Sequence, residues 1–120
     1  MVQQMNPYLE AARLYLSDAH ILQNAGGTPA GVVSQCWMAV SECVKALLAD
    51  KGLVKIHDHR RHGELLARTY PDETELWTVY EELRRLHRDT YDTPFSLMAD
   101  DARLATEDVE RAIARCRELL

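Results

Sequence analysis

The sequence predicts an all-α fold: an up-and-down antiparallel bundle of four long helices plus one short helix, in a single domain over residues 1–120. Apolar residues recur at steps of three and four along most of the chain, as on one face of a helix. No segment alternates apolar and polar residues as a half-buried strand does, and five Gly and four Pro leave little turn material for a many-stranded sheet. Because most connections between helices are short, neighbouring helices are expected to be antiparallel.

Matching start and stop signals bound the first two helices. Asn6-Pro7 places a capping side chain before a proline in the first turn, and Thr28-Pro29 repeats that pattern. The first helix is expected over residues 8–23, with a stop at Gly26-Gly27 because glycine tolerates the left-handed closing conformation. The second helix is expected to end at Lys51-Gly52 and to form the centre of the core. Its apolar stripe consists of Val33, Cys36, Trp37, Val40, Cys43, Val44, Leu47 and Leu48.

A short helix and a long helix follow. The short helix is expected to run from an N-cap at Asp58 to about Arg68, with Leu65 and Leu66 facing the core. Residues 72–75 have the spacing of a capping box, in which a cap acceptor is followed three residues later by Glu, and so predict the next helix start. The inner stripe of that helix is expected to consist of Leu76, Trp77, Tyr80, Leu83, Leu86 and either His87 or Tyr91.

The segment over residues 92–105 shows weak periodicity. It contains Pro94, Asp100 and Asp101, and a loop is expected there. Thr106 is then expected to cap the last helix.

Composition and cysteine content favour a soluble, cytoplasmic protein. Three cysteines without a CxxC pair form neither a disulfide framework nor a zinc ribbon. No secretory signal is visible, and no stretch approaches the roughly 20 apolar residues of a membrane span, so no membrane contact is expected. The formal net charge of -5 argues against general electrostatic coating of nucleic acid, although a local basic site remains compatible with it.

Three segments together resemble the HEPN domain family. They are SECVKALLADKG (residues 41–52), HDHRRHGELL (residues 57–66), and the last two helices with LRRLHRDTYD (residues 83–92) and TEDVERAIARCRELL (residues 106–120). This resemblance covers nearly the whole chain and implies a HEPN-like helical bundle that usually forms a homodimer. Some family members are metal-independent ribonucleases with an Arg-x4-6-His motif on the penultimate helix. Others lack that pair and act as binding or partner modules, often encoded beside a small nucleotidyltransferase.

The ribonuclease motif is missing from the penultimate helix. No His follows Arg84, Arg85 or Arg88 at the required spacing, so the sequence argues against nuclease activity. Arg13 and His20 match the spacing, but they lie on the first helix, and a match of this kind is expected by chance. The alternative is a divergent ribonuclease that uses Arg84, Arg85, Arg88, His87 and Tyr91.

Three histidines cluster before and within the short helix. His57, His59 and His62, together with Asp58, are weak candidates for a metal site because neutral imidazoles are common ligands. The segment has no cysteine, no second acidic arm and no HExxH motif. The alternative is a solvated helix start in which one His caps the helix or packs under the connector, and no cofactor is expected.

Two basic segments interrupt the acidic chain. Arg60 and Arg61 lie in the first, which runs from Lys55 to Arg68. The second contains Arg84, Arg85 and Arg88. If the two segments pack together, they form a groove for RNA or a nucleotide phosphate; the alternative is that these arginines are the solvated faces of amphipathic helices.

The function predicted from these observations is a HEPN-like binding or partner module. It is expected to act as a homodimer, to associate with a minimal nucleotidyltransferase as in a toxin–antitoxin pair, and to contact RNA or a nucleotide through its basic segments. A purely structural dimeric bundle without a small ligand is a further alternative.

Overall fold

The computed structural model describes residues 6–53 and 59–120, and all regular elements in these two ranges are helical. The helices are α1 (Pro7–Asn24), α2 (Pro29–Asp50), α3 (His59–Thr69), α4 (Thr74–Asp92) and α5 (Ala99–Leu119), with a short 3₁₀ turn, η1 (Pro94–Ser96), between α4 and α5. Four long helices and one short helix confirm the predicted fold class.

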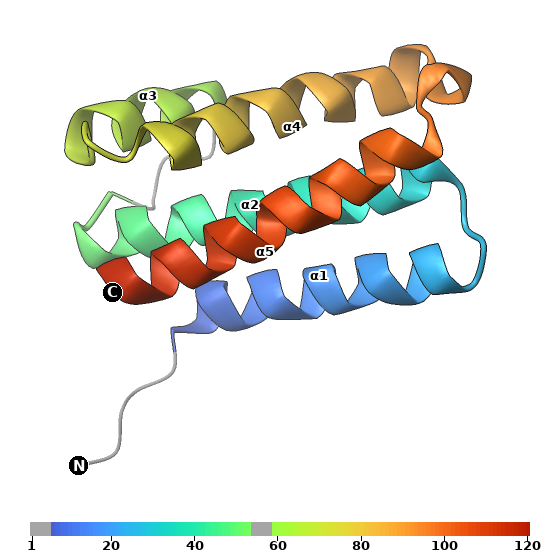
Figure 1. Cartoon of the computed structure of the whole chain (residues 1–120). Coiled ribbons are helices and arrows are strands. Elements are labelled where there is room, and N and C mark those ends of the chain that lie inside the picture. Colours follow the sequence, from blue (N-terminus) through green and yellow to red (C-terminus); the bar gives the residue numbers. More distant parts are fainter. Residues whose placement is uncertain (1–5, 54–58) are drawn as a thin grey trace.

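The helices form an up-and-down bundle around α2. In Figure 1, α2 and α5 occupy the middle of the molecule, with α1 on one side of them and α3 and α4 on the other. α1 and α4 run in one direction, and α2 and α5 run in the opposite direction. Because α2 contacts each of the other four α-helices, it is the centre of the core, as its apolar stripe predicted.

Burial extends around α2 beyond that stripe. Val32, Ala39 and Ala46 are buried along with the predicted stripe, since neighbouring helices surround α2. Contrary to the expectation from sequence, α2 is long and apolar enough to cross a membrane by length and composition alone. However, 67% of its most apolar stretch is buried inside the bundle, which is the behaviour of the core helix of a soluble protein.

The predicted starts and stops of α1 and α2 are confirmed. The Asn6 side chain accepts hydrogen bonds from the backbone of Tyr8 and Leu9 at 3.0 and 3.1 Å, and the Thr28 hydroxyl accepts one from Gly31 at 3.1 Å. Gly26 and Gly52 close the two helices with φ of 77° and 72°. In each case the next amide donates back to a carbonyl five residues earlier, in the pattern of a Schellman motif.

The loop predicted over residues 92–105 is confirmed only for residues 93–98, and its C-terminal part is wrong, because α5 begins at Ala99 rather than at Thr106. The Asp101 carboxylate accepts a hydrogen bond from the Met98 amide at 2.8 Å, and acidic side chains in a first turn complement the helix dipole. Ala102 and Ala105 are buried within the bundle. Thr106 lies inside the helix, where its hydroxyl donates to the Arg103 carbonyl at 2.8 Å.

The capping box predicted at residues 72–75 is also wrong. Glu73 occupies the N-cap of α4 and makes no side-chain capping bond. Its carboxylate instead accepts two hydrogen bonds from Arg115 of α5, at 2.9 and 2.5 Å, and these lower the pKa of Glu73. Glu75 likewise binds Arg111 of α5 at 3.2 Å. Acidic residues at this helix start therefore connect α4 to α5 rather than cap α4.

Trp77 was predicted on the inner stripe of α4 but is 42% exposed. The buried row of this helix consists of Leu76, Val79, Tyr80 and Leu83. Trp77 instead faces the surface beside α3, where it lines a groove described below.

Candidate functional site

The structure places only part of the histidine cluster. His57 and Asp58 lie outside the described residues, and so does the side chain of His59. His62, in the first turn of α3, is buried, with 1% of its surface exposed. Within the described part of the chain, no group of three or more His, Cys, Asp or Glu side chains is arranged to hold a metal ion.

α3 and α4 pack together, as the anion-site prediction required, and enclose a shallow groove of about 440 Å³. We call it the α3–α4 groove. It is lined mainly by Arg60, Glu64 and Arg68 of α3 and by Trp77, Glu81 and Arg84 of α4. The helices approach closely at Gly63, where a Cβ would lie 2.6 Å from Glu81 Oε1 and 3.2 Å from the Tyr80 ring.

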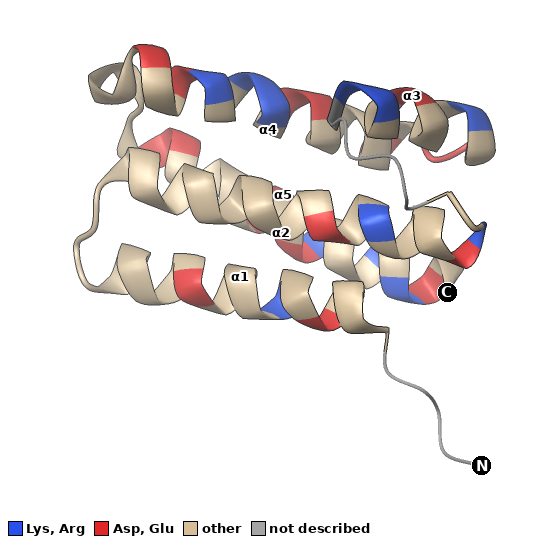
Figure 2. Cartoon of the chain, turned by 180° about the vertical axis from the view of Figure 1, so that it is seen from behind, with Lys and Arg blue, Asp and Glu red and all other residues tan. Residues whose placement is uncertain are grey.

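Charges in the α3–α4 groove are only partly compensated. Arg60 lies 3.8 Å from Glu64, and Arg84 lies 3.1 Å from Glu81. Arg68 forms no ion pair with any residue that the structure describes. Three arginines against two glutamates therefore leave the groove with an excess positive charge. Figure 2 shows this mixture of basic and acidic residues along α3 and α4.

The other predicted anion-binding residues lie outside this groove. Arg61 binds Glu64 at 3.2 Å, and Arg85 binds Glu82 at 2.6 Å. Arg88 is exposed and makes no ion pair within the described residues. Of the five arginines predicted from sequence, packing therefore brings together Arg60 and Arg84, and it adds Arg68 and Trp77.

His87 belongs to an aromatic stack on the inner side of α4. Its ring stacks on Trp37 of α2 with centroids 5.5 Å apart and an interplanar angle of 22°. The Tyr91 ring meets it edge-on at 5.0 Å. These contacts orient a half-buried imidazole against the core, whereas Tyr91 itself is exposed.

The three cysteines are buried thiols. Cys36, Cys43 and Cys116 are all reduced. Burial, together with the charges of Asp108 and Glu110, raises the pKa of Cys36 to about 12. A hydrogen bond with Cys116 and burial raise the pKa of Cys43. Because the thiolate is the reactive form, the raised pKa values of Cys36 and Cys43 disfavour reaction as nucleophiles, and all three side chains are buried contacts of the core.

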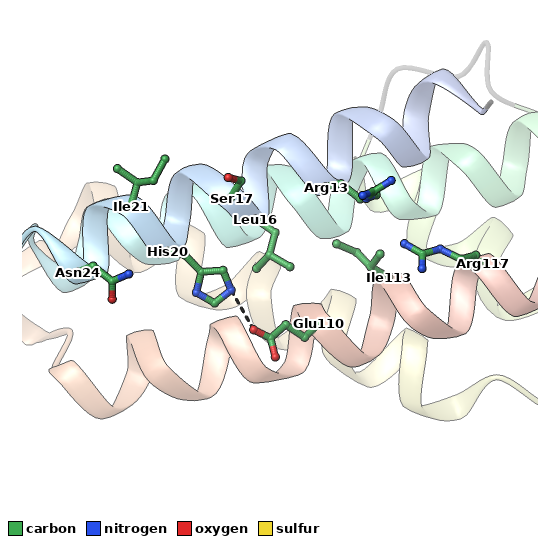
Figure 3. A pocket seen from close by; sticks show the side chains of 9 residues that line it. All are labelled: Arg13, Leu16, Ser17, His20, Ile21, Asn24, Glu110, Ile113 and Arg117. Atoms are coloured by element: carbon green, nitrogen blue, oxygen red, sulfur yellow. Dashed lines mark ion pairs between the residues drawn. The ribbon is translucent and has the colours of Figure 1, made fainter.

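A second groove, which we call the α1–α5 groove, has a volume of about 400 Å³ (Figure 3). Arg13, Ser17 and His20 of α1 and Glu110, Ile113 and Arg117 of α5 line it. Sequence reasoning missed this groove. The one signal was the spacing of Arg13 and His20, which places both on one face of α1 but indicates nothing about what packs opposite.

Fold and surface together define a class of protein: a small all-α up-and-down bundle with arginine-lined grooves between its helices. Residues 5–120 match the HEPN domain family, and the chain belongs to that family. This membership confirms the resemblance drawn from the sequence segments. No curated protein and no solved structure matches the chain at a significant level.

Proposed function

We propose that this HEPN domain is a binding module that contacts single-stranded RNA or a nucleotide in the α3–α4 groove. The observation that carries the proposal is that packing of α3 on α4 places three arginines around one partly exposed Trp77. An indole face stacks on any base, and a guanidinium fork fits a phosphate, so this pair of groups supplies the two contacts that single strands require.

The charge of the groove suits a weak, local contact. The Arg68 guanidinium makes no ion pair with a described residue, so its N–H groups can donate to a ligand. Glu64 and Glu81 partly neutralise the positive charges of Arg60 and Arg84. A chain with a net charge of -5 repels nucleic acid on average, so binding would depend on this groove rather than on the whole surface. We therefore expect strong salt dependence and a short binding site.

Trp77→Ala should weaken binding of an oligouridylate at low salt by about fivefold to 150-fold, because stacking on one base contributes about 1–3 kcal/mol. Arg68→Gln should weaken it too and should reduce the salt dependence by about one phosphate contact. Fluorescence anisotropy of a labelled oligouridylate measures both effects. Arg103→Gln is the matched control, since this exposed α5 arginine lies outside the groove and should leave binding unchanged.

Two results would contradict this proposal. If the protein bound neither RNA nor a nucleotide at low salt, the result would favour a purely structural bundle without a small ligand. Cleavage of structured RNA in EDTA that disappears in Arg88→Ala or His87→Ala would instead identify a divergent ribonuclease.

The proposed protein partners are a second copy of the chain and a minimal nucleotidyltransferase, in the cytoplasm. Family membership supports both partners, because many HEPN domains pair in this way. Exposed apolar side chains gather where α4 passes through η1 into α5, at Tyr91, Phe95 and Met98. Patches of this kind on a small soluble domain mark interaction surfaces, and a homodimer contact at this corner would cover them.

Light scattering should give a mass twice the 13.7 kDa of one chain. Phe95→Asp should shift that mass to the monomer, because it places a charge on an 83%-exposed ring position at the proposed contact. Leu14→Asp, which alters an exposed leucine on α1, is the control and should remain dimeric. A monomeric wild type at micromolar concentration, or a dimer unaffected by Phe95→Asp, would contradict this assignment.

A further inference from the structure

The α1–α5 groove brings together side chains from antiparallel helices in a simple register. His20 Nε2 of α1 lies 2.8 Å from Glu110 Oε1 of α5. α1 and α5 are antiparallel, so a residue seven positions before His20 on α1 lies opposite a residue seven positions after Glu110 on α5. These two residues are Arg13 and Arg117. Figure 3 shows these two arginines at the same end of the groove, away from the His20–Glu110 pair.

The arginine end of the groove has uncompensated hydrogen-bond donors. Arg117 forms no ion pair with any other described residue. Arg13 has one acidic neighbour, Glu10 at 3.4 Å, which lies on its own helix. Like charges that face each other repel, and an oxyanion between two guanidinium groups removes the repulsion while accepting hydrogen bonds from both. This end is therefore suited to a carboxylate or a phosphate.

Between the arginines and the His20–Glu110 pair, the groove is lined by two apolar side chains and by Ser17. The apolar side chains are Leu16 and Ile113, and Ile113 is almost fully buried. Seven residues of helix separate the two arginines from the His20–Glu110 pair, which corresponds to about 10 Å. A volume of about 400 Å³ lies within the range of small-molecule sites, roughly 300–1,000 Å³.

We propose that the α1–α5 groove binds a small molecule that carries a carboxylate or a phosphate on an apolar body. Arg13 and Arg117 bind the oxyanion, and Leu16 and Ile113 contact the apolar body. Beyond this apolar stretch the groove continues past the His20–Glu110 pair to Asn24. This site lies on the opposite side of the α2–α5 layer from the α3–α4 groove, so it does not depend on the RNA-binding proposal.

Titration with octanoate, octyl phosphate and octanol, followed by amide ¹H–¹⁵N NMR, tests the proposal. Octanoate or octyl phosphate should shift the amides of Ser17, His20 and Ile113 in a saturable way, and the tighter of the two identifies the preferred oxyanion. Octanol should bind at least about tenfold more weakly, since it lacks the charge that the arginines bind. Arg117→Gln should weaken the anionic probes by a similar factor.

Arg103→Gln, on the same helix but outside the groove, is the control and should bind like the wild type. If Arg117→Gln disturbs α5, Arg13→Gln on the facing helix tests the same loss of affinity for the anionic probes independently. Equal affinity for octanol and octanoate, wild-type affinity in both arginine variants, or no saturable shift in the groove with any probe would overturn the proposal. If the RNA-binding proposal failed, these outcomes would not change, because the residues of the α3–α4 groove lie on other helices.

Discussion

Ala105→Asp is expected to destabilise the domain by about 3 kcal/mol or more, because a carboxylate would be buried without a partner. Ala105 is 2% exposed on the inner face of α5. Total stabilities of small domains are about 5–15 kcal/mol, so this change removes a large part of the stability. Urea denaturation followed by far-ultraviolet circular dichroism measures the loss.

Leu104→Asp is the matched control. Leu104 precedes Ala105 in the same helix but is 49% exposed, so the same charge remains in water and the free energy of unfolding should change by about 0.5 kcal/mol or less. If residues 92–105 formed a loop, as periodicity alone predicted, the two variants would behave alike. Equal stability of the two would therefore contradict the extended α5.

Trp37→Ala is expected to reduce the free energy of unfolding by about 3–5 kcal/mol. Trp37 is 3% exposed on α2, and its ring contacts Tyr80 at 5.2 Å and stacks on His87. Truncation leaves a cavity between α2 and α4 and removes the surface that orients the His87 ring. Chemical denaturation measures the stability, and the chemical shifts of His87 measure the loss of ring stacking.

Trp77→Ala provides the comparison for Trp37→Ala. Because Trp77 is partly exposed in the α3–α4 groove, its loss should cost little stability while it weakens RNA or nucleotide binding. A stability loss in Trp77→Ala as large as that in Trp37→Ala would show that the two indoles share one core.

The candidate site was only partly predictable. Clustering of basic residues identified Arg60 and Arg84, because charge is visible in the sequence. The contribution of Trp77 was missed, since an aromatic residue next to Leu76 fits an apolar stripe as well as a surface platform. Pairing of Arg13 with Arg117 was also invisible, because those residues lie far apart in the chain and meet only through the antiparallel packing of α1 and α5.

The sequence by itself determined the fold class and the bounds of α1 and α2, because their signals act within a few residues. The Asn6 and Thr28 caps and the closing glycines Gly26 and Gly52 need no distant partner. Tertiary structure decided the early start of α5, since alanines carry a weak apolar signal until another helix buries them. It also decided the use of Glu73, which occupies the N-cap position of α4 but binds Arg115 of α5 instead of capping the helix. Both grooves belong to this second group, because each forms only where two helices meet.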